Sequence, residues 1–578
     1  MWSKVLKYLK GYRLFAVLTP ICIFFEVLLE VYIPFIMAQI IDIGVAEGDL
    51  DYIISKGLQM ILMAFLALLL GVLAAYFSSK AGSGLEKNVR QGLYYKIQDF
   101  SFANIDKFST PSLVTRLTTD IVNTKMSFIM TIRMLARAPF MFVFAIVMAV
   151  RLNAELSLVF LFAVPVLIVT LVLITTKAFP KFRVMLEKYD KLNGVVQENL
   201  IATRVVKAFV RGDFEKDKFD DIASQVRDTQ VKAERIVIWN MPVMQLVIYS
   251  CIIAVAWFGG NKIVVGDMQA GQLISFISYI TQILVSLMMV SMVLVFLVMA
   301  RASVQRIVEV LDEEPEIKNP KQGTNPPVED GSVVFENVSF SYSDGESPYV
   351  LEDIDFTIES GETLGIIGGT GSSKTSLVSL IPRLYDVSKG RLLVGGKDVR
   401  EYNLDTLRDS VAIVLQKNVL FSGTIKDNLK WGNEHATDEE IIEACKIAMA
   451  HDFIMSFPAG YDTYLGQGGV NVSGGQKQRI SIARSLLKNP KIIILDDSTS
   501  AVDTKTESSI RHALRTKLKE TTTIIISQRV SSIKDADKIL VLDDGKINGL
   551  GTHDELMENN KIYREIYESQ QKGVALGE

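Results

Sequence analysis

The stretch Gly368-Gly369-Thr370-Gly371-Ser372-Ser373-Lys374-Thr375 determines the fold that we expect for the second half of the chain. An apolar run typical of a strand, 363–367, precedes it, and a helical pattern begins at Ser376. A glycine-rich loop between a strand and a helix is the context of a phosphate-binding P-loop. Small residues let backbone N–H groups surround phosphate oxygens, and the helix N-terminus favours negative charge. The pattern predicts that Lys374 contacts the terminal phosphates and that the Thr375 hydroxyl binds Mg²⁺.

One loop position departs from this motif, because Ser373 stands where a glycine is expected. A Cβ atom there would strain the loop or weaken its hold on phosphate. The alternative is a Gly/Ser-rich turn that binds no ligand. The strand and the helix on either side favour the P-loop.

The composition excludes several other classes of protein. A chain of 578 residues is expected to form several domains. Its net charge of −4 argues against binding to nucleic acid. The three cysteines have neither the spacing of a metal site nor that of a disulfide framework. The first apolar run is too long for a cleavable secretory signal.

Apolar runs long enough to cross a membrane fill the first part of the chain. Each reaches the roughly 20 residues that a spanning helix needs. The six runs are 14–41, 57–77, 132–150, 156–176, 238–260 and 273–299. The N-terminus and the segments after the second and fourth runs are basic, and the segment after the first is acidic. Because positive residues mark the cytoplasmic side, we predict a multi-pass protein of the inner (plasma) membrane, with its N-terminus and C-terminal half in the cytoplasm.

The two long cytoplasmic segments, 78–131 and 177–236, are polar but keep a helical period. We expect spans two to five to extend into the cytoplasm and to turn through short connecting helices within 102–117 and 202–214. Both stretches mix apolar and charged residues, which favours docking onto another domain. The alternative is a solvated loop.

Some residues within the predicted spans are unusual for a bilayer. Ionisable groups there are costly and usually face a protein interior or a watery cavity. They are Glu26 and Glu30 in the first span and Arg133 and Arg137 in the third, each pair four residues apart; the sixth span carries Met288, Met289 and Met292. The charged residues either pair between helices or line a cavity that selects cationic substrates. The methionines either pack the core or offer an adaptable binding surface.

A charged, proline-containing segment, 301–327, precedes a change to short strands, glycine turns and amphipathic helices. The predicted organisation is a six-helix transmembrane domain over 1–310, a linker over 311–330 and an α/β P-loop domain over 331–572.

Two further motifs strengthen the prediction of a nucleotide site. The run 492–495 is a buried parallel strand, and Asp496 at its carboxyl end is the expected partner of Mg²⁺ beside Thr375. Ser473-Gly474-Gly475-Gln476 begins a helical run and forms a second anion-binding turn. Tyr342 lies upstream of the P-loop strand, where it either stacks on a base or belongs to the core.

The order of these motifs resembles the nucleotide-binding domain of an ATP-binding cassette (ABC) transporter. Six apolar runs before that domain resemble a half-size ABC exporter, so the resemblance covers nearly the whole chain. The residues that carry it are Tyr342, 368–375, Gln416, 473–479, Asp496 and Ser500-Ala501-Val502-Asp503.

The resemblance implies a role for each motif. Tyr342 is expected to stack on the adenine of ATP, and Gln416 to respond to Mg²⁺ and to the membrane domain. Asp503 is expected at the nucleotide as well. Two such domains would pair head to tail, with ATP between one P-loop and the Ser473–Gln476 signature of the other chain. The family's coupling helices would fall in the two docking segments.

Departures from the family pattern concern the hydrolytic residues. Asp497 replaces a glutamate that positions the attacking water, and Gln528 replaces a histidine. An amide can hydrogen-bond phosphate but lacks the charge and proton of an imidazole. Gln467 stands where exporters usually have an acidic residue, and Val472 replaces a leucine before the intact signature. This asymmetry resembles the degenerate-site subunit of heterodimeric bacterial multidrug exporters, whose partner half-transporter carries the catalytic Glu and His.

The altered hydrolytic residues are compatible with other functions as well. Asp497 and Gln528 are also compatible with an active homodimer, or with a nucleotide-gated channel or regulatory membrane subunit. A peptide exporter with an attached protease is disfavoured, since the first span follows Trp2 closely. The family resemblance implies export of small hydrophobic or amphipathic compounds, drugs or lipids, through the lipid bilayer.

Overall fold

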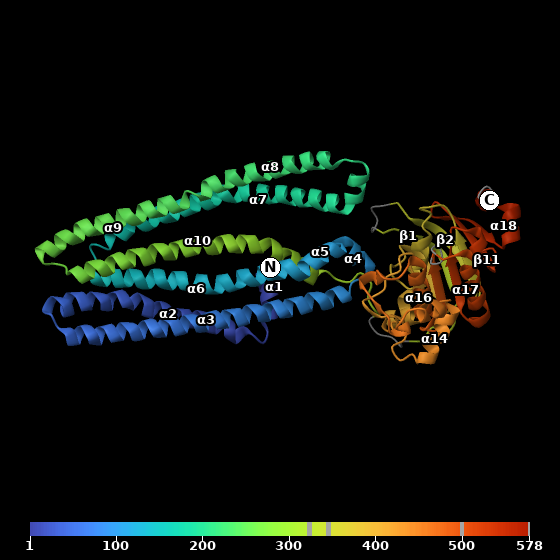
Figure 1. Ribbon diagram of the computed structural model, residues 1–578, viewed down its shortest axis with the longest axis horizontal. Helices are drawn as coiled ribbons and strands as arrows, with labels where there is room; N and C mark the ends of the chain where they lie inside the picture. Colours follow the sequence, from blue (N-terminus) through green and yellow to red (C-terminus); the bar gives the residue numbers. More distant parts are fainter. Residues whose placement is uncertain (321–325, 343–347, 498–501, 576–578) are drawn as a thin grey trace. The chain divides into compact units, whose positions relative to one another are not determined.

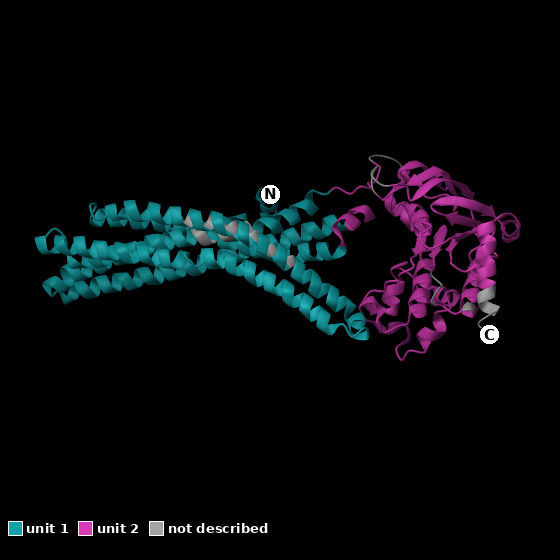
Figure 2. Cartoon of the chain, turned by 90° about the horizontal axis from the view of Figure 1, so that it is seen from above, with its two compact units in different colours: residues 1–98, 110–313 teal, residues 99–109, 314–578 magenta. Residues whose placement is uncertain are grey.

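The computed structural model describes residues 1–320, 326–342, 348–497 and 502–575. The chain forms two compact units, Met1–Gln98 with Thr110–Glu313, and Asp99–Ser109 with Glu314–Glu578 (Figure 2). By its contacts, the segment 99–109 belongs to the second unit, although it lies inside the transmembrane domain that the sequence predicts. Ser500 and Ala501 lie outside the described residues, as does the side chain of Met292.

Unit 1 consists of helices and turns, and its described residues contain no strand. Its elements are α1 (Trp2–Leu6), η1 (Lys7–Leu9), α2 (Arg13–Gln39), η2 (Ile40–Val45), α3 (Leu50–Gln98), α5 (Thr110–Thr115), η3 (Arg116–Asp120), α6 (Ile121–Leu152), α7 (Leu158–Ala208), α8 (Gly212–Val237), α9 (Asn240–Val265) and α10 (Ala270–Asp312).

Six helical stretches of the described chain are long and apolar enough to cross a membrane, which confirms the predicted number. They are Arg13–Val45, Leu50–Gln98, Thr110–Leu152, Leu158–Ala208, Gly212–Val265 and Ala270–Val290. At 1.5 Å per residue, α3 is about 70 Å long, more than twice the roughly 30 Å of a bilayer's hydrocarbon core. The helices therefore extend well beyond a membrane, as the polar cytoplasmic segments predict.

Within unit 1, α2, α3, α6 and α10 pack together, and α7 runs alongside α8 and α9 (Figure 1). Small buried residues such as Ala74 and Ala145 allow close helix contact. Large apolar side chains, among them Leu68, Phe162 and Leu246, lie exposed on the outside of the spans. An apolar surface of this extent indicates a membrane environment.

Unit 2 contains a six-stranded and a four-stranded sheet among its described residues. The six-stranded sheet has the order β12-β11-β3-β10-β9-β6, and the four-stranded sheet has the order β2-β1-β4-β5. The strands are β1 (Val333–Phe340), β2 (Leu351–Ile358), β3 (Thr363–Ile367), β4 (Lys389–Val394), β5 (Lys397–Asp398), β6 (Val411–Val414), β9 (Ile492–Asp496), β10 (Thr522–Ile526), β11 (Lys538–Asp543) and β12 (Lys546–Gly551). β3, β6, β9, β10 and β11 are parallel, and β12 pairs antiparallel to β11.

The parallel strands are buried on both faces. In β9, Ile492 and Ile494 belong to one apolar core, and Ile493 and Leu495 belong to another. A continuous apolar run is what a strand covered on both sides requires. The register places Ile526 of β10 opposite Asp496 of β9 and Ile366 of β3, so the carboxyl ends of these strands meet at one edge.

The predicted connecting helices have different outcomes. The first stretch contains a short separate helix, α4 (Phe102–Phe108), followed by α5. The second prediction is wrong: α7 continues to Ala208, the chain turns over 209–211, and α8 begins at Gly212. Val210 takes a positive φ of 54° in this turn. The helical period of 202–214 has no breaker before Gly212, so the sequence does not signal that the turn is so tight.

Asn104 joins the segment 99–109 to the chain after α10. Its Oδ1 accepts hydrogen bonds from the Ser101 and Glu316 backbone N–H groups, at 3.1 and 3.2 Å, and its Nδ2 donates to the Glu314 carbonyl at 3.1 Å. Ser101 and Asn104 also form the capping box that begins α4. One buried amide thus satisfies backbone groups of two distant segments.

We expect Asn104→Ala to loosen this junction by about 1–3 kcal/mol, because it leaves buried backbone groups without partners. Limited proteolysis of the full-length protein should then cut within 99–109 faster than in the wild type. Thr110→Ala, at an exposed neighbouring position, is the control. Equal cutting of both variants would contradict this role of Asn104.

Candidate functional site

The loop between β3 and α11 (Lys374–Leu380) has the geometry that the P-loop motif predicts. Lys374 folds back over the loop, and its Nζ donates to the Gly368 carbonyl, the Gly369 carbonyl and the Ser372 hydroxyl at 2.9, 2.7 and 3.0 Å. Burial lowers the pKa of Lys374, and the carboxylates of Asp496 and Asp497 oppose this shift. The ammonium group is therefore held where it would meet the phosphates of a bound ligand.

Ser373 is the N-cap of α11 and lies in the left-handed region, with φ 68° and ψ 24°. A residue with a Cβ atom is strained there by about 1–2 kcal/mol, and glycine is not. The neighbouring loop residue Gly371 also has a positive φ, of 86°. The departure at Ser373 thus falls on a position whose backbone favours glycine.

Thr375 and Asp496 form the predicted magnesium-binding pair. The Thr375 Oγ1 donates to Asp496 Oδ2 at 2.9 Å, and burial raises the pKa of the Asp496 carboxyl. Hydroxyl and carboxylate oxygens suit Mg²⁺, which usually takes few protein ligands and completes its shell with water and substrate phosphates. Among the described residues no cluster of three or more His, Cys, Asp or Glu could hold a metal alone. The pair therefore fits a Mg²⁺ ion that arrives with a phosphate ligand.

Asp497 follows Asp496 and adopts a positive φ of 45°. Its Oδ2 accepts from Gln416 Nε2 at 3.4 Å and from Gln528 Nε2 at 3.3 Å. Burial raises the pKa of Asp497, and the hydrogen bond from Gln416 opposes the shift. The sheet edge therefore brings together three side chains that lie far apart in the sequence.

These groups surround one cavity of about 320 Å³. It is lined by Thr370, Gly371, Ser373, Lys374, Thr375, Ser376, Gln416, Asp496, Asp497, Ile526 and Gln528. Gly368, Gly369 and Ser372 lie on the same loop and contact Lys374.

Tyr342 is not a core residue, because 49% of its surface is exposed. Its hydroxyl lies 2.8 Å from the Ser376 hydroxyl, beside the P-loop helix. Tyr385 was not predicted from the sequence. Its ring stands edge-on to Tyr342 at 5.1 Å between centroids, and its hydroxyl donates to Asp106 Oδ2 of α4 at 2.8 Å. Nothing in the spacing around Tyr385 signals this position.

The Ser473–Gln476 signature is not among the residues that line the P-loop cavity. Ser473 caps α16 (Gly474–Leu486), where its backbone N–H donates to Gln476 Oε1 at 2.8 Å and its Oγ accepts from the Gln476 N–H. Ser473 and Gly474 are exposed, so this helix N-terminus is open to a ligand. Asp503 caps α17 (Thr504–Lys517) by accepting from the Thr506 N–H at 2.9 Å.

The charged residues of the spans pair between helices. Arg137 of α6 bridges Glu26 and Glu30 of α2, one guanidinium nitrogen to each carboxylate. Arg133 is exposed one turn earlier on α6, and Met288 packs against the core of unit 1. The arrangement favours the pairing interpretation; a role of these residues, or of Met292, in substrate selection stays a prediction.

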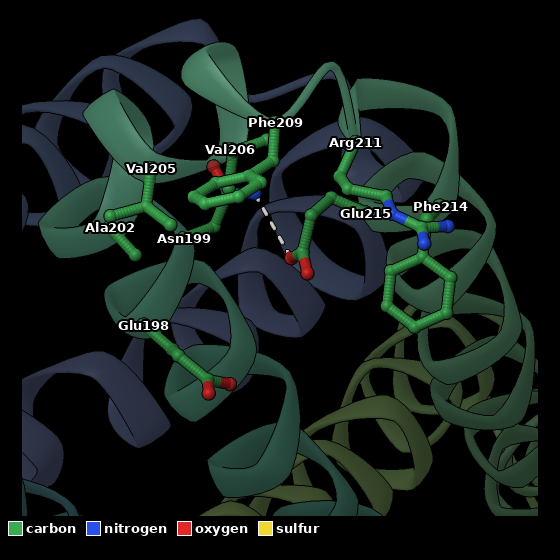
Figure 3. A pocket seen from close by; sticks show the side chains of 9 residues that line it. All are labelled: Glu198, Asn199, Ala202, Val205, Val206, Phe209, Arg211, Phe214 and Glu215. Atoms are coloured by element: carbon green, nitrogen blue, oxygen red, sulfur yellow. Dashed lines mark hydrogen bonds between the residues drawn. The ribbon is translucent and has the colours of Figure 1, made fainter.

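The turn between α7 and α8 carries a cavity of about 530 Å³ (Figure 3). It is lined by both apolar and polar side chains: Glu198, Asn199, Ala202, Val205, Val206, Phe209, Arg211, Phe214 and Glu215. Asn199 Nδ2 donates to Glu215 Oε2 at 3.0 Å and ties the two helices together. Ile201, Phe209 and Val210 are 78%, 74% and 88% exposed. In unit 2, Val419, Phe421 and Trp431 form a second exposed apolar patch shortly after Gln416, with the two rings stacked at 4.0 Å.

Comparison with known proteins relates both units to described families. Residues 17–288 match the ABC transporter transmembrane region, and residues 351–500 match the ABC transporter domain. The uncharacterized ABC transporter ATP-binding protein YfiB of Bacillus subtilis is 38% identical over 98% of both chains. An ATP-dependent lipid A-core flippase of Desulfotalea psychrophila is 30% identical over 93% of both, and a putative multidrug export ATP-binding/permease protein of Staphylococcus aureus is 37% identical over 66% of both. A bacterial Atm1-family ABC exporter with ATP bound has a similar structure, with a TM-score of 0.81 and 26% identity over 98% of both chains.

The left-handed backbone at residue 373 gives a direct prediction. Ser373→Gly should raise the stability of unit 2 by about 1 kcal/mol, because it removes the Cβ strain and only part of the gain is lost to the greater freedom of the unfolded chain. Ser373→Ala keeps the Cβ atom and should give no such gain. Thermal unfolding of the solubilised full-length variants without nucleotide measures this, and an equal rise in both variants would refute the strain.

Proposed function

Since the chain belongs to the ABC transporter family and combines both parts of an exporter half-transporter, we propose that it is the degenerate-site subunit of a heterodimeric exporter. The transporter moves hydrophobic or amphipathic compounds, drugs or lipids, out of the cytoplasm. The chain binds ATP with Mg²⁺ at its own P-loop and offers its Ser473–Gln476 signature to the competent site of a different half-transporter. Its N-terminus and nucleotide-binding unit lie in the cytoplasm.

The environment of Asp497 is the observation that carries this proposal. Asp497 is one methylene shorter than the family's glutamate, and its carboxylate is held by the amides of Gln416 and Gln528. No histidine is among the residues that line the cavity in the described chain. A base must lie within hydrogen-bond reach of the attacking water, and a misplacement of about 1 Å can cost ~10²-fold in rate. Both changes weaken hydrolysis, while Lys374, Thr375 and Asp496 remain fit to bind ATP and Mg²⁺.

The exposed N-terminus of α16 supports a second nucleotide-binding domain as the partner. Its backbone N–H groups and Ser473 are suited to phosphate, yet they do not line the chain's own P-loop cavity. A partner P-loop that carries ATP would use this surface. The intact signature beside an altered P-loop site is the asymmetry that a heterodimer needs.

The α7–α8 turn supports the same partner. Exposed apolar patches of this kind mark interaction sites, and a protein surface that receives Phe209 and Val210 would remove them from water. We assign them to the nucleotide-binding domain of the second half-transporter, at the patch corresponding to Val419, Phe421 and Trp431. Each half-transporter would then cover an exposed apolar patch of the other.

In the proposed cycle, Lys374 and the loop N–H groups hold the phosphates of ATP, and Tyr342 stacks on the adenine. Thr375 and Asp496 hold Mg²⁺, which offsets phosphate charge when bound. In this proposal α4 would transmit closure of the two nucleotide-binding domains to the membrane helices, because Asn104 and Asp106 fix it to the rest of unit 2. Release of a transported compound requires a lower affinity in the outward-facing state than in the inward-facing state.

ATPase measurements on the full-length protein test the degenerate site. The chain purified alone should hydrolyse Mg-ATP at a near-background rate, and co-expression with a half-transporter that carries Glu and His should give strong activity. Asp497→Glu with Gln528→His should raise the rate of the chain alone by roughly 10²-fold, since the signature is intact. Lys374→Ala in that double variant is the inactive control. Strong activity of the wild type alone, lost in Asp497→Asn, would instead establish an active homodimer.

The docking surface gives a separate prediction. Phe209→Glu places a charge in the exposed apolar tip, that is, the α7–α8 turn around Phe209 and Val210. The variant should fold as the wild type does, but it should associate less with the partner half-transporter and uncouple transport from ATP hydrolysis. Vesicle transport and co-purification measure this effect. Asp220→Ala, on the exposed side of α8, should behave as the wild type. Unchanged association and transport in Phe209→Glu would exclude docking at this tip.

A further inference from the structure

The C-terminal helix α19 (Lys561–Ala575) contacts the loop that follows β10. Gln570 Nε2 donates to the Gln528 carbonyl at 2.7 Å, and Gln570 Oε1 accepts from the Val530 N–H at 2.9 Å. One side-chain amide thus pairs with main-chain groups two residues apart, as a neighbouring strand would. Both bonds have the length of ordinary, well-formed hydrogen bonds.

The helix that carries Gln570 packs against the core of unit 2. Tyr563 is fully buried; its hydroxyl lies 2.8 Å from His553 Nδ1, and its N–H donates to Asn560 Oδ1 at 2.9 Å. Ile562, Ile566 and Tyr567 pack against the apolar core that contains Val530 and Ile533. The position of the Gln570 amide is therefore set by core packing, and the loop is held against a rigid support.

The loop held by Gln570 carries a residue of the nucleotide site. Gln528 follows the end of β10 by two residues, lines the P-loop cavity and donates from Nε2 to Asp497 Oδ2. Ser527 Oγ also accepts from the Arg529 N–H at 3.0 Å, which tightens the turn on the β10 side. Because the allowed side-chain rotamers depend on the backbone torsions, fixing the Gln528 carbonyl restricts the directions that the Gln528 side chain can take.

We propose that Gln570 is a positioning residue of the nucleotide site, and that its amide holds residue 528 toward Asp497 and the terminal phosphate of ATP. The inference rests on the proposed function in one respect, namely that residue 528 faces the terminal phosphate. The C-terminal helix then belongs to the nucleotide-responsive part of the domain. Because both bonds go to main-chain atoms, they do not depend on which side chain stands at 528.

The test uses three variants of the full-length protein. Gln570→Met keeps the length and apolar part of the side chain but loses both hydrogen bonds. Gln570→Glu keeps an acceptor for the Val530 N–H and loses the donor to the Gln528 carbonyl. Gln571→Ala, at an exposed neighbouring position, is the matched control.

We call the two hydrogen bonds from Gln570 to the main chain at 528 and 530 the clamp. Hydrogen exchange of a peptide covering 527–533 measures the clamp directly. Gln570→Met should speed exchange at Val530 by tenfold or more and reduce the protection that Mg-ATP adds to this peptide. Gln571→Ala should exchange as the wild type, and Gln570→Glu should fall between them. Unchanged exchange in Gln570→Met would overturn the proposal, whether or not the chain hydrolyses ATP.

Steady-state hydrolysis then separates positioning from a purely structural role. It is measured in the wild type if that is active alone, and otherwise in the Asp497→Glu, Gln528→His background, where the clamp remains. Gln570→Met should lower kcat about tenfold. The KM for ATP should stay within about twofold of the parent, and the thermal midpoint should stay within a few degrees of it. A fall in thermal midpoint that accounts for the lost activity, or an unchanged kcat, would overturn the proposal. An inactive Asp497→Glu, Gln528→His background would count against the proposed function alone, because the exchange experiment still decides the clamp.

Discussion

The parallel pairing of β3, β10 and β9 is the constraint on which the nucleotide site depends. Its register sets Ile366, Ile526 and Asp496 side by side, so the loops that leave the three strands begin at one edge. Lys374, Asp497 and Gln528 come from those loops and meet around one cavity. Burial on both faces leaves the sheet little freedom, since a shift of register would disrupt two apolar cores at once. Site geometry and core packing are thus the same structural requirement.

The P-loop and the N-terminus of α16, which we propose to bind ATP, differ in backbone strain and in capping. The P-loop side carries a strained Ser373 and a shortened acid held by two amides, whereas α16 keeps an exposed N-terminus with a capping box. The capping box satisfies the N–H groups of Ser473 and Gln476 within the chain, which stabilises this helix end without a ligand. In the heterodimer that we propose, α16 would offer this preformed helix end to a partner's nucleotide, while the chain's own P-loop site would hydrolyse ATP weakly. This division of roles is consistent with ABC exporters that work as two unequal halves.

In the membrane unit, the same principle of satisfied polar groups applies. Two carboxylates four residues apart on α2 share the guanidinium of Arg137, which makes charged side chains tolerable within a span. Polar groups also hold unit 2 together: Asn104 ties α4 to the segment after α10, and Tyr385 links α4 to the ring of Tyr342. The helices α3 and α7 have 49 and 51 residues, more than a bilayer's hydrocarbon core requires.

The sequence by itself determined the features that are local in the chain. The length of the apolar runs predicts the six spans, and the strand–loop–helix order predicts the P-loop. The position of Asp496 directly after a buried strand predicts its place at the edge of the sheet. Tertiary structure alone decided how distant residues combine. The spacing does not show that Gln570 reaches the loop after β10 or that Tyr385 stands against Tyr342. It predicted two alternatives for the charged residues of the spans, and the structure decided in favour of pairing of Arg137 with Glu26 and Glu30. The tight turn at 209–211 was likewise missed, because a helical period continues through it. The physical reason is that periodicity and turn chemistry act over a few residues, whereas these contacts are fixed by strand register and helix packing.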